Sequence, residues 1–325
     1  SHYALHDHNG VVDLWSNDAL SNETGQYSGY LYAHKAVGVV ENFTRTVARF
    51  AAEGRASAAP KGLFMYLAWH NTHTPLECPP EWMYPSLPAY NNSASSRMVY
   101  NCMARILDDG VGNVTAALRN AGLWDSTLLF FAGDNGGWVG NTGSNNYPLR
   151  GSKTSDFEGG VRVVSWLAGG YLPANVRGGV HSGYISIADW YGTLCNLVGV
   201  DAADDVAGLP PVESNDFWPS IITPNATTSG RDEIFLAWSC APPSSDVTGC
   251  DPRAVSIYNS SGDPTAGVNK GDMAYIAKNW KVVIGNQNGR GCVTSESGSD
   301  RSPRRERAMC CSRGAARSPL LRNAV

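Results

Sequence analysis

The sequence lacks several features that would place it in other classes of protein. It has no run of about 20 apolar residues, so a transmembrane segment is not expected. Its net charge is only −4, so a nucleic-acid partner is not expected either. Its eight cysteines are too few for a disulfide scaffold of 325 residues, although they suffice for a few bridges. Because 42% of the residues are hydrophobic, the chain can bury a sizeable core.

An N-terminal signal is absent as well. The chain begins with Ser1 and no apolar leader follows, and we expect that the natural start lies upstream. Six Asn-x-Ser/Thr sequons are present, which together favour the secretory pathway, with a lysosomal or extracellular destination. Their acceptor residues are Asn22, Asn42, Asn91, Asn113, Asn225 and Asn259. The composition gives no indication of the oligomeric state.

Apolar periodicity predicts alternating helices and strands along residues 1–209. Apolar residues recur at helical spacing over residues 39–50 and 99–118. A continuous apolar run at 63–69 predicts a strand that is covered on both faces, 127–132 predicts a second buried strand, and 161–167 is a third candidate strand. This alternation predicts an α/β fold, in which helices sandwich a mainly parallel central sheet. Ser186 and Asp189 form a capping box that predicts a further helix through Leu197.

The pattern changes after residue 209. Short strands are expected at 234–238, 273–277 and 280–284, with Lys278-Asn279 as the turn of a hairpin. We therefore predict a small antiparallel α+β subdomain over residues 210–297. Residues 298–325 hold seven Arg against Asp300 and Glu306, a net charge of 7 − 2 = +5, and little apolar periodicity. This basic tail is expected to be disordered.

Polar residues follow two of the predicted strands directly. His73 comes after the first strand, and Asp134-Asn135 after the second. In an open α/β sheet, the carboxyl ends of parallel strands line one crevice. Asp134 and Asn135 offer hard oxygen ligands for calcium or magnesium, although Asp-Asn-Gly-Gly alone is more often a simple turn. Lys153 is a compact cation suited to an oxyanion, although a lysine in a loop is ordinarily just solvated.

Several spaced motifs together resemble the type I sulfatases of the alkaline phosphatase superfamily, and the arylsulfatase B group most closely. Three of these motifs are Asp134-Asn135-Gly136-Gly137, Pro148-Leu149-Arg150-Gly151-x-Lys153 and Glu158-Gly159-Gly160-Val161-Arg162. His73-x-Pro75, Asp189-Trp190-Tyr191 and Trp280-Lys281-Val282-Val283 agree with the same family. The resemblance covers roughly residues 30–290 and implies an alkaline-phosphatase-like fold.

The resemblance implies hydrolysis of sulfate esters, with a sulfated small molecule or glycan as substrate and sulfated sugars favoured. Asp134 and Asn135 would bind one calcium ion. His73 and Lys153 would hold the sulfate oxygens, and one of them would assist proton transfer to the leaving oxygen. In the arylsulfatase B group a bridge occupies what look like the positions of Cys250 and Cys292, which implies a Cys250–Cys292 disulfide, with Cys240 as a rival partner for Cys250.

One element of the family pattern is missing from the sequence. Sulfatases form a formylglycine nucleophile in a Cys/Ser-x-Pro-x-Arg motif, and these 325 residues contain no copy of it. Two of the family's metal-binding Asp residues are not identifiable either. We therefore expect an N-terminally incomplete sulfatase that is inactive by itself. Two alternatives remain: a phosphate-ester hydrolase of the same superfamily, and a non-catalytic protein that has kept the fold.

Overall fold

The computed structural model describes residues 14–23, 25–79, 96–139, 142–203, 211–227, 229–238 and 273–284. They fall into two compact units. Unit 1 lies within residues 1–129, 138–145 and 169–171, and unit 2 within residues 130–137, 146–168 and 172–325. The boundary expected at 209–210 falls beside residues 204–210, which are not described, and it stays a prediction. The basic tail over 298–325 also lies outside the described residues.

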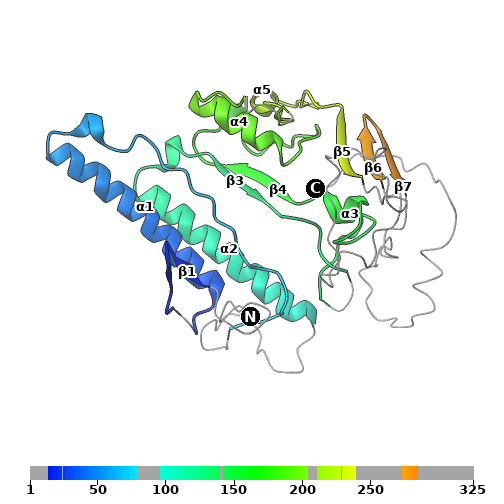
Figure 1. Cartoon of the computed structure of the whole chain (residues 1–325), viewed down its shortest axis with the longest axis horizontal. Coiled ribbons are helices and arrows are strands. Elements are labelled where there is room, and N and C mark those ends of the chain that lie inside the picture. Colours follow the sequence, from blue (N-terminus) through cyan, green and yellow to red (C-terminus); the bar gives the residue numbers. More distant parts are fainter. Residues whose placement is uncertain are drawn as a thin grey trace, which may run out of the picture. The chain divides into compact units, whose positions relative to one another are not determined.

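Unit 1 is built on two long helices, α1 (Ser28–Ala52) and α2 (Ser96–Asn120), which lie side by side in Figure 1. Two clusters of buried residues join them. The first holds Tyr27, Val99, Cys102, Met103 and Ile106, and the second holds Ala36, Val40, Val114 and Leu118. The helices therefore run parallel, because the early residues of one pack on the early residues of the other. Both helices were predicted, and Gly122, with φ +69°, ends α2 as expected.

Short elements complete unit 1. A two-stranded antiparallel hairpin of β1 (Trp15–Ser16) and β2 (Ala19–Leu20) precedes α1. The 3₁₀ turns η1 (Ala56–Ala58) and η3 (Trp124–Ser126) follow α1 and α2. The hairpin was not predicted, because two-residue strands leave no periodic signal.

Residues 63–69 correct one prediction. They form no strand with any other described residue, and they are not buried on both faces. Met65 and Leu67 pack on the second buried cluster between the helices, and Trp69 lies so close to Gly110 that a Cβ there would meet its ring. Phe64 and Tyr66 point the other way and are 79% and 85% exposed. The run is thus one-sided, because only its helix-facing residues have packing partners in unit 1.

A disulfide joins Cys78 to Cys102 at the start of α2, with the Cα atoms 6.0 Å apart. Sequence reasoning missed it, since cysteine spacing alone does not give the connectivity. The predicted partners Cys250 and Cys292 lie outside the described residues, so that bridge stays a prediction.

Removing the Cys78–Cys102 bridge should destabilise unit 1. The double change Cys78→Ser and Cys102→Ser should lower the free energy of unfolding by about 2–4 kcal/mol, because the bridge restricts the unfolded chain. Urea unfolding monitored by circular dichroism would measure this. Cys195→Ser, at the unbridged and partly exposed Cys195, is the matched control. Equal midpoints for the double variant and the control would refute a stabilising role.

Unit 2 contains most of a two-stranded sheet of β3 (Leu129–Ala132) and β4 (Ser165–Ala168). The backbone N–H of Gly133 donates to Val164 O at 3.0 Å, and that of Gly136 donates to Gly160 O at 2.9 Å. Residue numbers rise on one side as they fall on the other, so the two strands are antiparallel. The strand predicted at 161–167 is observed only from Ser165 onward, as β4, and Val161 belongs instead to helix α3 (Glu158–Val161). A mainly parallel sheet is not seen among the described strands.

The remaining helical elements of unit 2 are η4 (Ala174–Val176), α4 (Asp189–Val198) and α5 (Trp218–Ile221). The C-terminal strands form an antiparallel sheet in the order β5-β6-β7, with bounds Glu233–Trp238, Met273–Ala277 and Trp280–Ile284. The predicted hairpin is confirmed, since Ala277 pairs with Trp280 around the Lys278-Asn279 turn. Lys278 adopts φ +50°, as such a turn requires.

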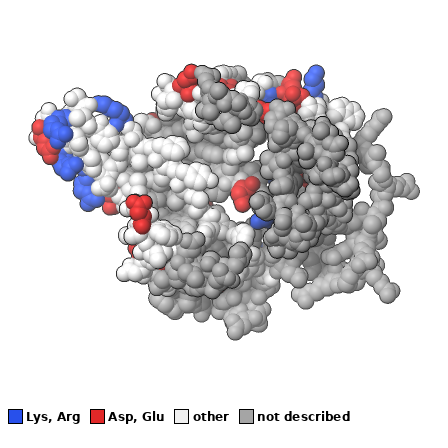
Figure 2. All heavy atoms as spheres, viewed as in Figure 1, with Lys and Arg blue, Asp and Glu red and all other residues white. Residues whose placement is uncertain are grey.

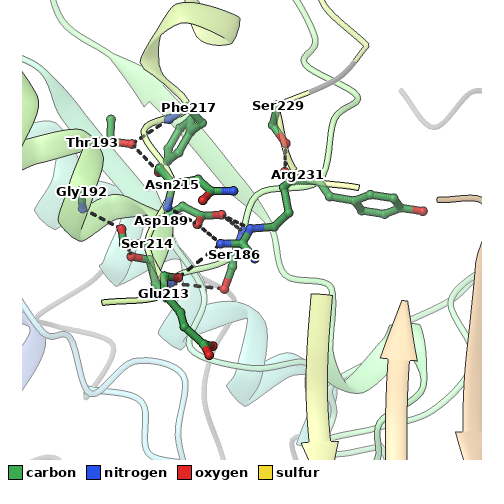
Figure 3. Close-up of polar contacts among 12 residues, drawn as sticks. Ser186, Asp189, Gly192, Thr193, Glu213, Ser214, Asn215, Phe217, Ser229 and Arg231 are labelled. Atoms are coloured by element: carbon green, nitrogen blue, oxygen red, sulfur yellow. Dashed lines mark hydrogen bonds and ion pairs between the residues drawn. The ribbon is translucent and has the colours of Figure 1, made fainter. Parts of the chain in front are cut away.

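A buried ion pair organises the polypeptide around α4 (Figure 3). Asp189 is 1% exposed, and its carboxylate accepts the backbone N–H of Ser186 at 2.8 Å, which is one contact of the predicted capping box, although α4 itself begins at Asp189 with Ala188 as its N-cap. The same carboxylate accepts Arg231 Nε at 2.9 Å and the backbone N–H of Asn215 at 3.0 Å. One carboxylate thus joins three segments that are far apart in sequence.

The described surface shows no strong charge of one sign on the face in Figure 2. Lys or Arg and Asp or Glu gather together at the C-terminal end of α1, where Arg49, Glu53 and Arg55 are exposed. Arg55 and Glu53 form an ion pair of 3.2 Å. Within the described ranges, no helix has the length and apolar character to cross a membrane.

Candidate functional site

Three of the sequence motifs meet in unit 2 through backbone hydrogen bonds. The N–H of Lys153 donates to Gly137 O at 3.1 Å, which joins the lysine loop to the Asp134-Asn135 segment. The N–H of Gly159 donates to Arg150 O at 2.6 Å, which joins the lysine loop to α3. Together with the bond from Gly136 to Gly160, these contacts fix the three motifs on one another.

Glycines make this approach possible. A Cβ atom at Gly136 would overlap the carbonyl oxygen of Gly159, and a Cβ at Gly160 would overlap that of Ser155. Any other residue would force the two backbones apart. We call the contact among Gly136, Gly159 and Gly160 the glycine junction.

Asn146 is a residue of this site that sequence reasoning missed. Its Oδ1 accepts the N–H of Gly137 at 2.9 Å, and its Nδ2 donates to the carbonyls of Gly137 at 2.8 Å and Gly151 at 3.1 Å. The side chain therefore clamps the segment after Asn135 to the loop before Lys153. An asparagine in a polar loop carries no periodic signal, so only the folded structure reveals this role.

Asp134 and Asn135 lie at the turn that follows β3. Asp134 is exposed, and its Oδ1 accepts the N–H of Asn135 at 2.8 Å. Asn135 Nδ2 donates to Gly136 O at 3.0 Å, which orients the amide and leaves its oxygen for a cation. These two groups fit part of a calcium site, although the ion prefers about 6–8 oxygen ligands. The described residues contain no cluster of three or more His, Cys, Asp or Glu of metal-binding geometry.

His73 lies in unit 1, whereas Asp134, Asn135 and Lys153 lie in unit 2. The convergence of His73 with the other three therefore stays a prediction. His73 is exposed, and its Nδ1 lies 2.7 Å from Thr74 O. Because a carbonyl only accepts hydrogen bonds, Nδ1 is the donor in this contact.

Asn71 supports the turn that carries His73, and it was also missed. Its Nδ2 donates to Met103 O at 2.8 Å and to the Tyr27 hydroxyl at 3.3 Å, which ties the turn to both helices. Nearby, the Tyr32 hydroxyl lies 3.5 Å from His70 Nε2, and burial raises the pKa of Tyr32. The His73 turn is thus fixed by the packing of unit 1.

Comparison with known proteins identifies the family of the chain. A model of the sulfatase family matches residues 5–200. Arylsulfatase J of Mus musculus is 30% identical over 227 residues, covering 68% of this chain and 33% of that protein. N-acetylgalactosamine-6-sulfatase of Canis lupus familiaris is 31% identical over 156 residues, covering 46% of this chain and 27% of that protein.

Solved structures show the same fold. The crystal structure of Ps i-CgsB superposes with a TM-score of 0.58 and 25% identity, covering 82% of this chain and 48% of that one. A second structure of it, in complex with k-i-k-neocarrahexaose, superposes with the same TM-score and 24% identity, with the same coverage.

The chain belongs to the sulfatase family, whose members hydrolyse sulfuric esters. Its fold is the α/β fold of that family, although the described strands do not form the predicted parallel sheet. The chain spans about a third of the length of the curated relatives that it matches.

Proposed function

We propose that the protein hydrolyses sulfate esters, with Lys153 binding the sulfate group and Asp134 and Asn135 contributing to a calcium site. The observation that carries the proposal is the backbone hydrogen bonding that joins the Lys153 loop to the Asp134-Asn135 turn in unit 2. It holds a cation and two hard oxygen ligands on one rigid junction. A metal ion such as calcium requires the oxygen ligands, and an anionic ester requires the cation.

The chemistry follows from the charges. Sulfate-ester cleavage places negative charge on the sulfate oxygens and on the leaving oxygen, and cations fixed in advance stabilise that charge. Lys153 supplies one such cation, and His73 is the second sulfate ligand or the proton donor. Calcium, when bound, supplies a further positive charge. The nucleophile would be a formylglycine from a Cys/Ser-x-Pro-x-Arg motif outside these 325 residues.

Sulfated sugars are the proposed substrates, because the sequence motifs resemble those of the arylsulfatase B group. Two relatives support a sugar substrate: one is named N-acetylgalactosamine-6-sulfatase, and one solved structure holds a neocarrahexaose.

The proposed compartment is the secretory pathway, with a lysosomal or extracellular destination. The acceptor asparagines of the four described sequons, Asn22, Asn42, Asn113 and Asn225, are all exposed, as glycosylation requires. Asn91 and Asn259 lie outside the described residues. The Cys78–Cys102 bridge also favours an oxidising compartment.

Turnover by a longer chain that carries the nucleophile motif tests the proposal. We expect calcium-dependent release of 4-nitrophenol from 4-nitrophenyl sulfate, at a higher kcat/KM than from 4-nitrophenyl phosphate. Asp134→Ala should remove the response to added calcium, whereas Asp108→Ala, an exposed carboxylate on α2, should not. Preference for the phosphate ester would establish the phosphatase alternative, and no turnover of either aryl ester or of a sulfated sugar would establish a non-catalytic protein.

A further inference from the structure

The glycine junction is connected to the C-terminal sheet by one ion pair. Glu158 is the first residue of α3 and directly precedes Gly159 and Gly160. Its Oε1 accepts a hydrogen bond from Lys281 Nζ at 2.8 Å. Lys281 lies on β7, 123 positions later in the sequence, and its side chain is only 18% exposed. The lysine side chain is therefore largely covered, whereas that of Glu158 is 36% exposed.

Two further contacts hold the turn of the same hairpin. The Tyr184 hydroxyl donates to Lys278 O at 2.7 Å, at the turn between β6 and β7, and Lys278 N–H donates to Asp232 O at 2.6 Å. Burial and the charge of Glu158 raise the pKa of Tyr184. The hairpin is thus fixed at its turn by Tyr184 and along β7 by Glu158.

Through the glycine junction, the position of Glu158 affects the backbone of the candidate site. Gly159 contacts the carbonyls of Arg150 and Gly151, and Gly160 contacts Gly136 by a hydrogen bond. Because these contacts leave no room for a Cβ atom, α3 cannot shift without moving the backbone on both sides of it. One of these backbones carries Lys153, and the other carries Asp134 and Asn135.

We propose that Glu158 and Lys281 are positioning residues for the sulfate site, through which the β6–β7 hairpin holds the Lys153 loop in place. The inference rests on the proposed function, because only that function makes this region a sulfate site. The connection between the β6–β7 hairpin and the Lys153 loop can nevertheless be tested without measuring turnover. Lys281 also neutralises a carboxylate beside a site that must attract an anion. If Lys281 were replaced by a neutral residue, Glu158 would keep Arg162 as a nearby cation, but at a longer distance of 3.9 Å from Nη1 to Oε2.

Hydrogen exchange in the 325-residue chain tests the link directly. Lys281→Met should raise amide exchange in peptides spanning 150–162 by about tenfold, whereas Lys281→Arg should keep exchange near the native rate. Lys278→Met is the matched control, because Lys278 is an exposed lysine of the same hairpin. Equal exchange for Lys281→Met and Lys278→Met would overturn the proposal. So would a rise that spreads equally over all of unit 2, since that would reflect general unfolding.

Kinetics in a sulfatase-active longer chain test the positioning role. Lys281→Met should lower kcat/KM for 4-nitrophenyl sulfate by about tenfold, and Lys281→Arg should restore most of it. Adding Glu158→Gln to Lys281→Met should recover part of the loss, because the unpaired carboxylate is then removed. Native kcat/KM in Lys281→Met would overturn the positioning role. A chain that turns over no ester, yet shows the predicted exchange pattern, would refute the proposed function and leave the mechanical link intact.

Discussion

Replacing Arg231 with methionine should destabilise unit 2 by about 3–5 kcal/mol, because it leaves a buried carboxylate without its counter-ion. The Asp189 side chain is 1% exposed and the Arg231 side chain 17% exposed, so both charged groups are largely removed from solvent. Arg231 also donates to Glu213 O at 3.3 Å, and the variant leaves this carbonyl without that partner (Figure 3). The effect is larger than for an ordinary surface ion pair because both charges are desolvated in the folded state.

Urea unfolding, followed by tryptophan fluorescence, would measure this change. Arg105→Met is the matched control, because Arg105 also pairs with a carboxylate, Asp109, at 3.4 Å, but its side chain is 57% exposed. The control should lose no more than about 0.5 kcal/mol. Similar midpoints for the two variants would show that the buried pair is not an important source of stability.

Replacing Lys153 with alanine should lower the turnover of a sulfate ester by about 10²-fold or more, in a longer chain that carries the nucleophile motif. Loss of one group that stabilises developing negative charge typically has this effect. The backbone N–H of Lys153 would still reach Gly137 O, so the loop should keep its position and the loss should come from the missing cation.

Initial rates with 4-nitrophenyl sulfate, with inorganic sulfate as a competing inhibitor, would test the role of Lys153. The variant should bind sulfate more weakly as well as react more slowly. Lys61→Ala, at an exposed lysine of unit 1, should behave as the parent protein does. An unchanged rate in Lys153→Ala would exclude Lys153 from the site.

The C-terminal hairpin was predicted at its observed bounds because its signals are local. Strand-forming residues flank Lys278-Asn279, and a tight turn fixes the pairing of its neighbours. The helices over 28–52 and 96–120 were recognised for the same reason, since a stripe of apolar residues reports directly on a buried face. Within the site, the three glycine-containing motifs were recognised from their order along the chain.

The structural features that could not be predicted from the sequence depend on contacts between residues that are distant along the chain. An apolar run such as 63–69 predicts burial but not how many faces are covered, and Phe64 and Tyr66 are exposed. The partners of Asp189 and Glu158 lie 42 and 123 positions away, and no local pattern around Arg231 or Lys281 indicates which distant residue each one contacts. The Asn146 clamp depends on the path of its loop, which a polar sequence does not encode in any periodic pattern.

The glycine junction also limits which amino-acid substitutions this site can accept during evolution. Main-chain atoms make its contacts, and the side chain of Asn146 adds hydrogen bonds to Gly137 and Gly151. Apart from Asn146 and the proposed Glu158–Lys281 pair, neighbouring side chains are therefore free to vary and to fit new substrates. At Gly136 and Gly160, in contrast, even one methyl group has no space. The part of the molecule with the smallest side chains is thus the part least tolerant of change, and adaptation to a new sulfate ester would have to come from residues around it.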